Sequence, residues 1–500
     1  MNELLRLDAL EIARRIRDRE VSPVEVVDVH IKRIEQVNPM LNAIVWTTFD
    51  RARDEARRAE QRLMRGEVLP LLGVPFTVKE MIALEGCPNA AGSWHRRNAI
   101  ARRDATAVSR LRAAGAIALG VTNQPEMGLW IESDSALYGR ARNPWDLARS
   151  PGGSSGGEGA IVGAGGSPFG VGSDAGGSIR LPSFYCGIAG HKPTSGLVPL
   201  SGHFPFVLDE EHPRHGPPPS GVVVGPMARS ARDLMPLLRI MAGPDGIDPH
   251  AREYAPGDPS LVDFRGKKVL VMDDPHFRWA SRTDREISSA VRAAASVLQE
   301  RGAIVESWSH PLVFEALGIW RAVFTEGRND ERASVLLGYG NPVVLRQEIA
   351  RWAFGRPRHS VSALALIASE ELLPKPRGTG RTLREKARTL LSALESALGP
   401  SGVLLLPPHP RVAPRHATSF LRPFDWAPTA LFNALGSPAT AVKTGMSREG
   451  MPLGVQIVGR GGEDHVTIAA GIAIEEALSG FVVPTVAPRA KRPRWRRVVS

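Results

Sequence analysis

Two glycine-rich turns stand close together in the sequence, and each carries serines. The stretch PGGSSGGEGAIVGAGGSPFGVGSDAGGSIRLP covers residues 151–182, with Ser154 in the first turn and Ser178 in the second. So much glycine costs conformational entropy unless the backbone must approach another group closely. A serine hydroxyl becomes a good nucleophile when a base removes its proton. The segment therefore predicts a nucleophilic site with two hydroxyl groups, which needs a base.

Lys79 is the candidate base, because the neighbourhood of these turns offers no histidine apart from His191. A lysine with its usual pKa of about 10.4 is protonated at neutral pH and cannot accept a proton. The apolar run 71–78 predicts a buried strand that ends at Lys79, and burial would lower the pKa of the amine if no carboxylate is close. Glu80 should point the opposite way if the strand continues.

Two other motifs can be read in the same stretch. Residues 152–156 also fit G-x-S-x-G, which would make Ser154 the nucleophile of an α/β-hydrolase turn, but that motif needs an apolar strand before it. Prolines and charges fill residues 142–151 instead and argue against such a strand. Residues 170–175 loosely resemble a dinucleotide-binding fingerprint, yet no acidic residue ends a second strand at the expected distance. Neither interpretation is favoured.

The elements that must position these residues alternate along the chain. A helix is predicted over 22–37, with Ser22 as N-cap, Pro23 at the first helical position and Glu25 as reciprocal partner. Further helices are predicted at 51–65, 284–301 and 464–478, and another helix is predicted to follow Asp104, which would be its N-cap. Strands are predicted at 116–121, 267–272, 303–308, 402–406, 439–442 and 454–458. This α/β alternation predicts a parallel or mixed sheet with helices on both faces.

No composition break divides the chain, so a single domain over residues 1–490 is expected. Residues 491–500 form a basic tail that we expect to be disordered. Two segments, 203–219 and 318–376, carry few helix or strand signals and suit variable elements beside a site. His203, His212 and His215 in the first segment are expected to be solvated histidines rather than metal ligands. Cys186 is expected to be packed.

The chain resembles the amidase signature family over nearly its whole length. The motifs that carry the resemblance are GGSSGG at 152–157, GSDAGGSIRLP at 172–182, GHKPTSGLVP at 190–199, GVPFTVKE at 73–80 and TNQPEM at 122–127. Within that family, residues 151–196 look most like the fatty acid amide hydrolases. The resemblance implies an α/β fold with a large mixed central sheet covered by helices on both faces.

Carried over motif by motif, the resemblance assigns catalytic roles. Lys79 would be the base, Ser154, preceded by a cis peptide bond, would pass on the proton, and Ser178 would be acylated. Consecutive backbone N–H groups at residues 175–178 (Ala175, Gly176, Gly177 and Ser178) could hold the oxyanion, with no side chain at 176 and 177 to block a close approach. Asp174 and Arg180 flank this turn and are expected to pair in a structural role.

The expected reaction is hydrolysis of amides, and the same acyl-enzyme route could open carbamates and esters. Relatives of the fatty-amide branch line the acyl pocket at positions that correspond to Gly128, Leu129, Trp130 and Ile131, and Ser155 is a second-rank candidate for substrate binding. Aromatic residues suggest a bulky apolar or aromatic substrate, although core packing explains them equally well: Trp130, Trp320, Phe324, Trp352 and Phe354. The alternative is the glutaminase subunit of a tRNA-dependent amidotransferase.

The composition and the charge distribution exclude several classes of protein. With 43% apolar and 23% charged residues, the 500-residue chain matches a soluble globular protein. Six of the eleven excess positive charges lie in residues 489–497, which weakens a nucleic-acid interpretation. Two cysteines, no secretion signal and no bilayer-length apolar stretch favour the cytoplasm. We expect a monomer or homodimer acting on a small molecule, without metal or cofactor.

Overall fold

A mixed sheet of 11 strands forms the centre of the protein in the computed structural model. The structure describes residues 2–206, 221–253, 255, 257–326, 333–372 and 380–487. The strand order is β1-β3-β2-β6-β8-β7-β12-β13-β11-β9-β10. The strands are β1 (Ile44–Thr47), β2 (Pro75–Lys79), β3 (Ile117–Thr122), β6 (Phe169–Asp174), β7 (Ala189–Lys192), β8 (Val223–Ala228), β9 (Lys268–Val271), β10 (Ile304–Ser307), β11 (Val403–Leu406), β12 (Ala439–Met446) and β13 (Pro452–Val458). A separate ribbon pairs β4 (Asp134–Ser135) with β5 (Gly139–Arg140).

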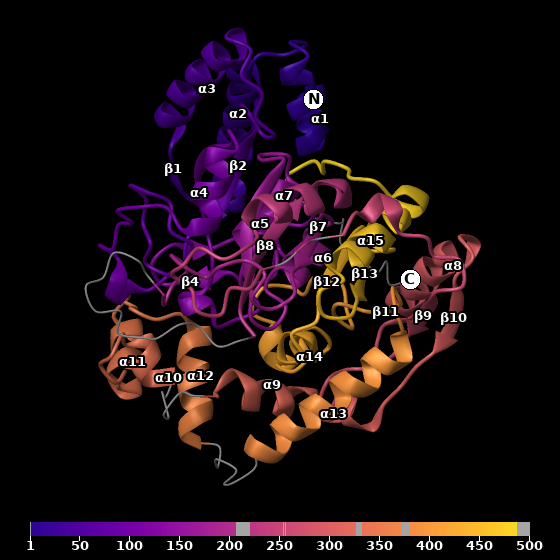
Figure 1. The fold of residues 1–500 in the computed structure, drawn as a ribbon. Coiled ribbons are helices and arrows are strands. Elements are labelled where there is room, and N and C mark those ends of the chain that lie inside the picture. The colour runs from indigo at the N-terminus through magenta and orange to yellow at the C-terminus, as the bar shows by residue number, and fades with distance from the viewer. Residues whose placement is uncertain are drawn as a thin grey trace, which may run out of the picture.

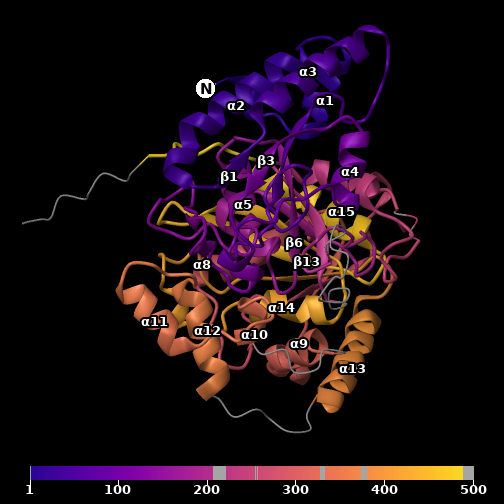
Figure 2. The same cartoon turned by 90° about the vertical axis from the view of Figure 1, so that its left-hand side faces the viewer.

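Helices surround both faces of this sheet (Figures 1 and 2). They are α1 (Ala9–Arg17), α2 (Pro23–Leu41), α3 (Phe49–Met64), α4 (Thr106–Ala113), α5 (Gly156–Gly163), α6 (Arg180–Cys186), α7 (Leu234–Met241), α8 (Arg285–Glu300), α9 (Ala316–Phe324), α10 (Ala333–Leu337), α11 (Leu345–Ala353), α12 (Val361–Leu372), α13 (Gly380–Leu398), α14 (Ala427–Ala434) and α15 (Asp464–Leu478). The first three lie together at one end of the molecule, and α9 to α13 lie at the opposite end (Figure 1).

The sheet is parallel where helices connect its strands and antiparallel elsewhere. Strand β2 runs parallel to both β3 and β6, and β9 runs parallel to β10 and β11. The strands between these two groups, from β8 to β13, pair antiparallel. Because β2 and β6 are parallel neighbours, their carboxyl ends lie at the same edge of the sheet. Lys79 and Asp174 end these two strands, so the two segments with chemical signals meet at this edge.

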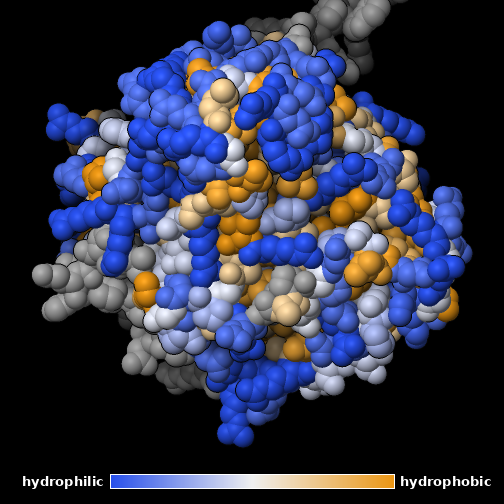
Figure 3. All heavy atoms as spheres, turned by 45° about the horizontal axis from the view of Figure 1, so that its top comes forward, coloured by the Kyte–Doolittle hydropathy of each residue, from blue (hydrophilic) through white to orange (hydrophobic). Residues whose placement is uncertain are grey.

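Apolar periodicity explains how the N-terminal helices pack. Helix α2 begins after Ser22, whose side chain accepts a hydrogen bond from the N–H of Glu25 at 3.0 Å, as predicted. Its buried residues recur at helical spacing and face the core, whereas mostly hydrophilic residues cover the outer surface of this end of the molecule (Figure 3). No helix in the described part of the chain is both long and apolar enough to cross a membrane.

Two local predictions were wrong. Asp104 does not cap a helix: Ala105 precedes α4, and the carboxylate of Asp104 instead accepts hydrogen bonds from the N–H of Glu85 and from Arg112. The segment 318–376 is largely helical in its described part, where it forms most of α9 and all of α10, α11 and α12. These helices are short, and α11 exposes large apolar residues such as Ile349 and Trp352, so little of the segment shows the long amphipathic pattern on which a helix prediction depends.

Candidate active site

The last residue of β2, Lys79, places its amine in the protein interior. Its side chain is fully buried, and its Nζ atom lies 2.6 Å from the Oγ atom of Ser154 and 3.0 Å from that of Ser173. The strand carries the lysine inward because β3 and β6 flank β2 on both sides. Ser173, which stands next to Asp174 in β6, was missed in the sequence because a serine within a strand gives no separate signal.

Burial controls the charge of this amine. It lowers the pKa of Lys79 to about 7, and the negative charges of Asp174 and Glu158 oppose this shift. The condition that no carboxylate is close is therefore not met, and burial lowers the pKa in spite of these two charges. The neighbouring Glu80 is not one of the carboxylates that oppose the shift. Its carboxylate accepts hydrogen bonds from the backbone N–H groups of Ala90 and Gly92 and from other donors. Near neutral pH, a substantial share of the Lys79 side chains is uncharged.

Glu158, in α5, is a buried acid that the sequence analysis did not single out. Its carboxyl group accepts hydrogen bonds from the hydroxyl groups of Thr77 at 2.6 Å and Thr122 at 2.9 Å. Burial raises the pKa of Glu158 to about 8, although the threonine hydrogen bonds and Lys79 act in the opposite direction. The signal was present: Glu158 is the one charged residue in a helix that otherwise consists of glycine and apolar residues.

The first glycine turn places Ser154 against the amine. The peptide bond between Gly153 and Ser154 is cis, and Ser154 is buried. A Cβ atom at Gly153 would lie 2.6 Å from the carbonyl oxygen of Trp130, so no other residue fits there without movement of the backbone. Ser155 directly precedes α5, and its hydroxyl group exchanges hydrogen bonds with the backbone of Ser173. Ser155 therefore joins the first turn to β6.

The second turn follows β6 and brings Ser178 beside the first. The backbone N–H of Ser155 donates to the carbonyl of Ser178 at 3.2 Å, so the two serine-bearing turns are in direct contact. Asp174 braces the second turn: its carboxylate accepts hydrogen bonds from the N–H groups of Gly177 at 2.6 Å and Ile179 at 3.0 Å. The guanidinium of Arg180, fully buried, pairs with Asp174 at 2.9 Å, as expected. This cation holds the pKa of the carboxyl well below its usual range.

Side chains from distant helices fix the carbonyl groups of the same turn. The indole N–H of Trp320 in α9 donates to the carbonyl of Ala175 at 2.6 Å, and the hydroxyl of Thr429 in α14 donates to that of Gly176 at 2.7 Å. Gly177 has a φ of +124°, and a Cβ atom there would lie 2.2 Å from the Thr429 hydroxyl oxygen. The turn therefore requires glycine at this position, and its peptide groups cannot rotate freely.

These contacts bear on the expectation that the N–H groups of residues 175–178 hold an oxyanion. The N–H of Gly177 is engaged by Asp174 and cannot also bind an oxyanion. The N–H groups of Gly176 and Ser178 donate to no described residue, and Ser178 is half-buried.

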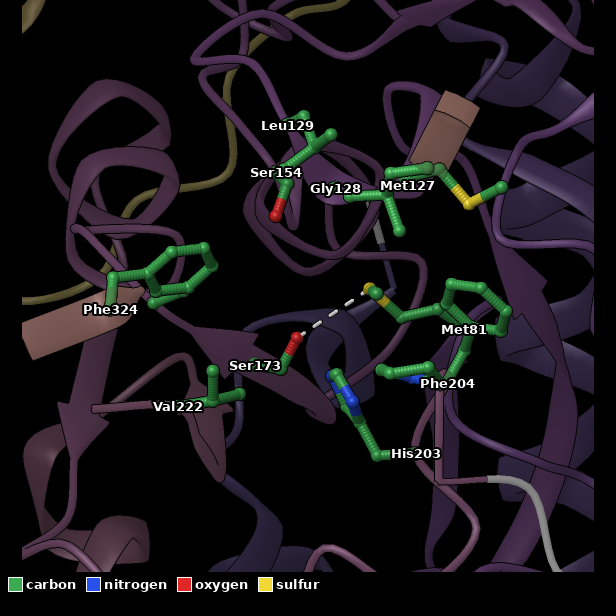
Figure 4. Close-up of a pocket in the computed structure, with 13 residues that line it drawn as sticks. Met81, Met127, Gly128, Leu129, Ser154, Ser173, His203, Phe204, Val222 and Phe324 are labelled. Carbon is green, nitrogen blue, oxygen red and sulfur yellow. Dashed lines mark hydrogen bonds between the residues drawn. The ribbon is translucent and has the colours of Figure 1, made fainter. Parts of the chain in front are cut away.

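A mostly apolar pocket opens beside the paired turns (Figure 4). It is lined by Met81, Met127, Gly128, Leu129, Ser154, Ser173, Ala175, His203, Phe204, Pro205, Val222, Phe324 and Leu336. Gly128 and Leu129 were predicted to line an acyl pocket and do line this one. Trp130 and Ile131 do not: the indole of Trp130 donates to the hydroxyl of Ser419 at 3.1 Å and stacks on Phe420.

The aromatic residues of the segment 318–376 divide into two groups. Phe324 lines the pocket and stacks on Trp320, at a centroid distance of 4.8 Å. Trp352 and Phe354 are 55% and 81% exposed and lie away from the pocket. The suggestion of an aromatic-lined site therefore applies to Phe324, on which Trp320 stacks from outside the pocket lining, and not to Trp352 or Phe354.

Of the three histidines expected to be solvated, His203 is the one that the structure describes, and there the prediction was wrong. It is 4% exposed and lines the pocket, because the backbone of residues 203–206 folds against Met81 and Ile82. His212, His215 and the basic tail at 491–500 lie outside the described residues. Cys186 is buried, as expected. Among the described residues, no group of three or more histidine, cysteine or acidic side chains is placed to hold a metal ion.

Comparison with known proteins gives a family match. The model of the Amidase family matches residues 25–468. The chain is 40% identical to fatty-acid amide hydrolase 2-B of Danio rerio, over 97% of this chain and 92% of the relative. It is 32% identical to a glutamyl-tRNA(Gln) amidotransferase subunit of Roseiflexus castenholzii, over 95% and 96%. A solved bacterial aryl acylamidase of the amidase signature enzymes superposes with a TM-score of 0.76 at 26% identity, over 94% and 96% of the two chains.

Proposed function

The chain belongs to the amidase signature family, whose hydrolases act on amide C–N bonds, and from this premise we propose that it hydrolyses acyl amides through an ester on Ser178. One observation carries the proposal: a buried amine with a pKa lowered to about 7 lies 2.6 Å from a serine hydroxyl, next to a second serine turn. An uncharged lysine is a base strong enough to activate serine without a histidine.

The proton path follows from this arrangement. Neutral Lys79 takes the proton of Ser154, Ser154 takes the proton of Ser178, and the Ser178 oxygen attacks the amide carbon. The C–N bond then breaks, and the departing nitrogen receives a proton back along the same path. In the second half-reaction, water gives up a proton to the relay and its oxygen attacks the ester. Ser178 leaves as the alcohol, the acid is released, and Lys79 returns to its neutral state.

The oxyanion of each tetrahedral intermediate needs hydrogen-bond donors. We assign the N–H groups of Gly176 and Ser178 to this role, with Ala175 at the edge of the turn. Two features support the assignment: these N–H groups have no described partner, and Trp320 and Thr429 hold the neighbouring carbonyl groups. Gly177 contributes by its lack of a side chain, since its N–H donates to Asp174.

The pocket supports an apolar acyl group as the preferred substrate. Most of its lining is aliphatic or aromatic, and none of the described lining residues is Lys, Arg, Asp or Glu. The name of the relative that is 40% identical, a fatty-acid amide hydrolase, agrees with this choice. Carbamates and esters with similar apolar groups are further proposed substrates, because Ser178 can attack their carbonyl carbon in the same way. An ester would give the same acyl ester on Ser178, whereas a carbamate would give a carbamoyl or carbonate group on that oxygen. Gly128 and Leu129 are the assigned acyl contacts.

The second candidate is the glutaminase subunit of an amidotransferase, supported by the 32% identity to such a subunit. A glutamine side chain ends in a polar amide with donors and acceptors to satisfy, and the apolar pocket suits it less well than an alkyl chain.

A fluorophosphonate probe, followed by mass mapping, tests the proposal. We expect labelling at Ser178, and loss of labelling in Ser178→Ala. A panel of fatty anilides, carbamates and esters should be hydrolysed by the isolated chain. The absence of both labelling and hydrolysis would contradict the amidase proposal. Release of ammonia from glutamine, with no hydrolysis of the other compounds, would favour the second candidate.

A further inference from the structure

His203 is a polar side chain that the proposed mechanism does not use. It is 4% exposed, it lines the pocket, and neither of its ring nitrogens has a hydrogen-bond partner among the described residues. The carbonyl groups of His203 and Phe204 lie near the ring and favour its charged form, but they do not meet hydrogen-bond geometry. An imidazole carries one donor and one acceptor when neutral, and a buried polar group without a partner is unfavourable.

Among the described residues, the imidazole makes no hydrogen bond that would hold its loop. The backbone of His203 fixes its position: its N–H donates to the carbonyl of Leu200 at 2.9 Å, and its carbonyl accepts from the N–H of Phe206 at 2.7 Å. Phe204 donates in turn to the carbonyl of Met81 at 2.8 Å. The imidazole then points into the cavity on the side of Ser173 (Figure 4). A side chain with no role in holding the loop therefore faces the space that the substrate would occupy.

The other polar groups of the pocket are already engaged. Ser154 and Ser173 are the remaining polar side chains among the described lining residues, and both hydroxyl oxygens lie within hydrogen-bond distance of Lys79. Burial and the nearby Lys79 lower the pKa of His203 to about 3, so its ring is neutral at ordinary pH. A charged substrate group would lose its hydration in this apolar cavity without gaining a partner of opposite charge. A neutral group that forms hydrogen bonds fits better.

We propose that His203 recognises a neutral oxygen substituent, such as a hydroxyl group, on the acyl chain of the substrate. This inference rests on the proposed function, because it takes the pocket to hold the acyl group. A site with a buried polar group selects the substrate that satisfies it and disfavours the analogue that does not. The preferred substrates are thus amides of hydroxylated acids, and plain alkanoyl amides of the same length are poorer.

A positional series of anilides tests this specificity. The purified full-length protein is given octanoyl p-nitroanilide and its monohydroxylated isomers, with the hydroxyl moved along the chain. We expect one or two neighbouring positions to raise kcat/KM about 10- to 100-fold above the plain octanoyl compound. If the plain compound is hydrolysed but no hydroxylated isomer is preferred, the inference is overturned while the amidase proposal stands.

Variants then connect the preference to the ring. In His203→Leu the ratio of kcat/KM for the preferred hydroxylated isomer to that for octanoyl should fall to about one, and His203→Gln, which keeps a donor and an acceptor, should retain part of it. Val222→Leu changes the pocket shape but not its polarity, and should leave the ratio near its wild-type value. Fluorophosphonate labelling of Ser178 reports whether each variant keeps a formed site. A preference that survives in labelled His203→Leu would overturn the inference.

Discussion

The Nζ atom of Lys79 lies 2.6 Å from the Oγ atom of Ser154, and both side chains are buried. At this distance the charge state of the amine decides whether the serine can lose a proton. Burial lowers the pKa of Lys79 to about 7, so the amine changes its charge close to neutral pH. This contact and the groups that support it therefore set how activity responds to pH and to substitution.

The rate of amide hydrolysis should rise as the pH increases through about 7. The uncharged amine is the active form, and its pKa lies near that value because the side chain is buried. The measurement is kcat/KM for a fatty anilide between about pH 5 and 9. A profile that stays flat across this range would show that Lys79 does not titrate as the base.

Replacement of the amine should remove most of the activity. Lys79→Met lacks a base, and the arginine side chain of Lys79→Arg stays protonated. Each substitution should therefore lower kcat by about 100- to 10,000-fold. Steady-state kinetics with thermal unfolding curves distinguish a lost base from a lost fold. Lys268→Met, at a half-exposed lysine of β9, is the matched control and should keep wild-type activity. Comparable activity in folded Lys79→Met would refute the assignment.

Glu158→Gln should move the acidic limb of the pH profile to lower pH. Glu158 raises the pKa of Lys79 when it is ionised, because its negative charge favours the ammonium form. Glutamine keeps nearly the same shape without the charge, so the amine should lose its proton at lower pH. Because burial raises the pKa of Glu158 itself to about 8, this carboxyl group is largely protonated where Lys79 titrates, and we expect the shift to be small. The shift is read from kcat/KM against pH. Movement of the limb toward higher pH would contradict the electrostatic argument.

Trp320→Phe should lower kcat more than it changes KM. The indole N–H holds the Ala175 carbonyl at 2.6 Å, and its loss frees the peptide group whose N–H is assigned to the oxyanion. Because Trp320 acts through that peptide, the loss should be smaller than the roughly 100- to 1000-fold that follows removal of a donor. Trp352→Phe, at a 55% exposed position, serves as the control. An effect confined to KM would indicate a substrate contact instead.

Arg180→Met should lower the free energy of unfolding and not only the catalytic rate. Arg180 and Asp174 form a fully buried ion pair, and removal of one partner leaves an uncompensated charge that costs about 3–5 kcal/mol. The free energy of unfolding in urea measures the effect. Arg265→Met breaks an exposed pair with Asp263 and should change stability little. Equal stability of the two variants would argue against a structural role for Arg180.

Much of the local structure could be predicted because its signals are short in range. The Ser22 cap, the strand that ends at Lys79 and the α/β alternation depend on neighbouring residues in the sequence. Asp104 misled the prediction because its carboxylate is used by Glu85 and Arg112, which come from other elements. A capping residue is recognised by its type, but its partner is chosen by packing.

In the candidate site, too, some residues could be predicted from the sequence and others could not. The serine-bearing turns and Lys79 could be found in the sequence, because glycine and serine in such density point to a backbone that closes around a group. Thr429 could not, since its position in the sequence carries no chemical pattern; Trp320 was named only as one aromatic residue of a variable segment, and His203 was expected to be solvated. They reach the site because α9, α14 and the loop after Leu200 pack beside the turn that follows β6.

The sequence by itself determined the family, the mixed α/β architecture and the residue types that could act as nucleophile and base. The tertiary structure alone decided that the amine is buried next to Ser154, that Asp174 occupies the N–H of Gly177, and that a histidine faces the pocket. The physical reason is that pKa values and free hydrogen-bonding groups depend on burial and on partners distant in the chain. Only the packed fold specifies these.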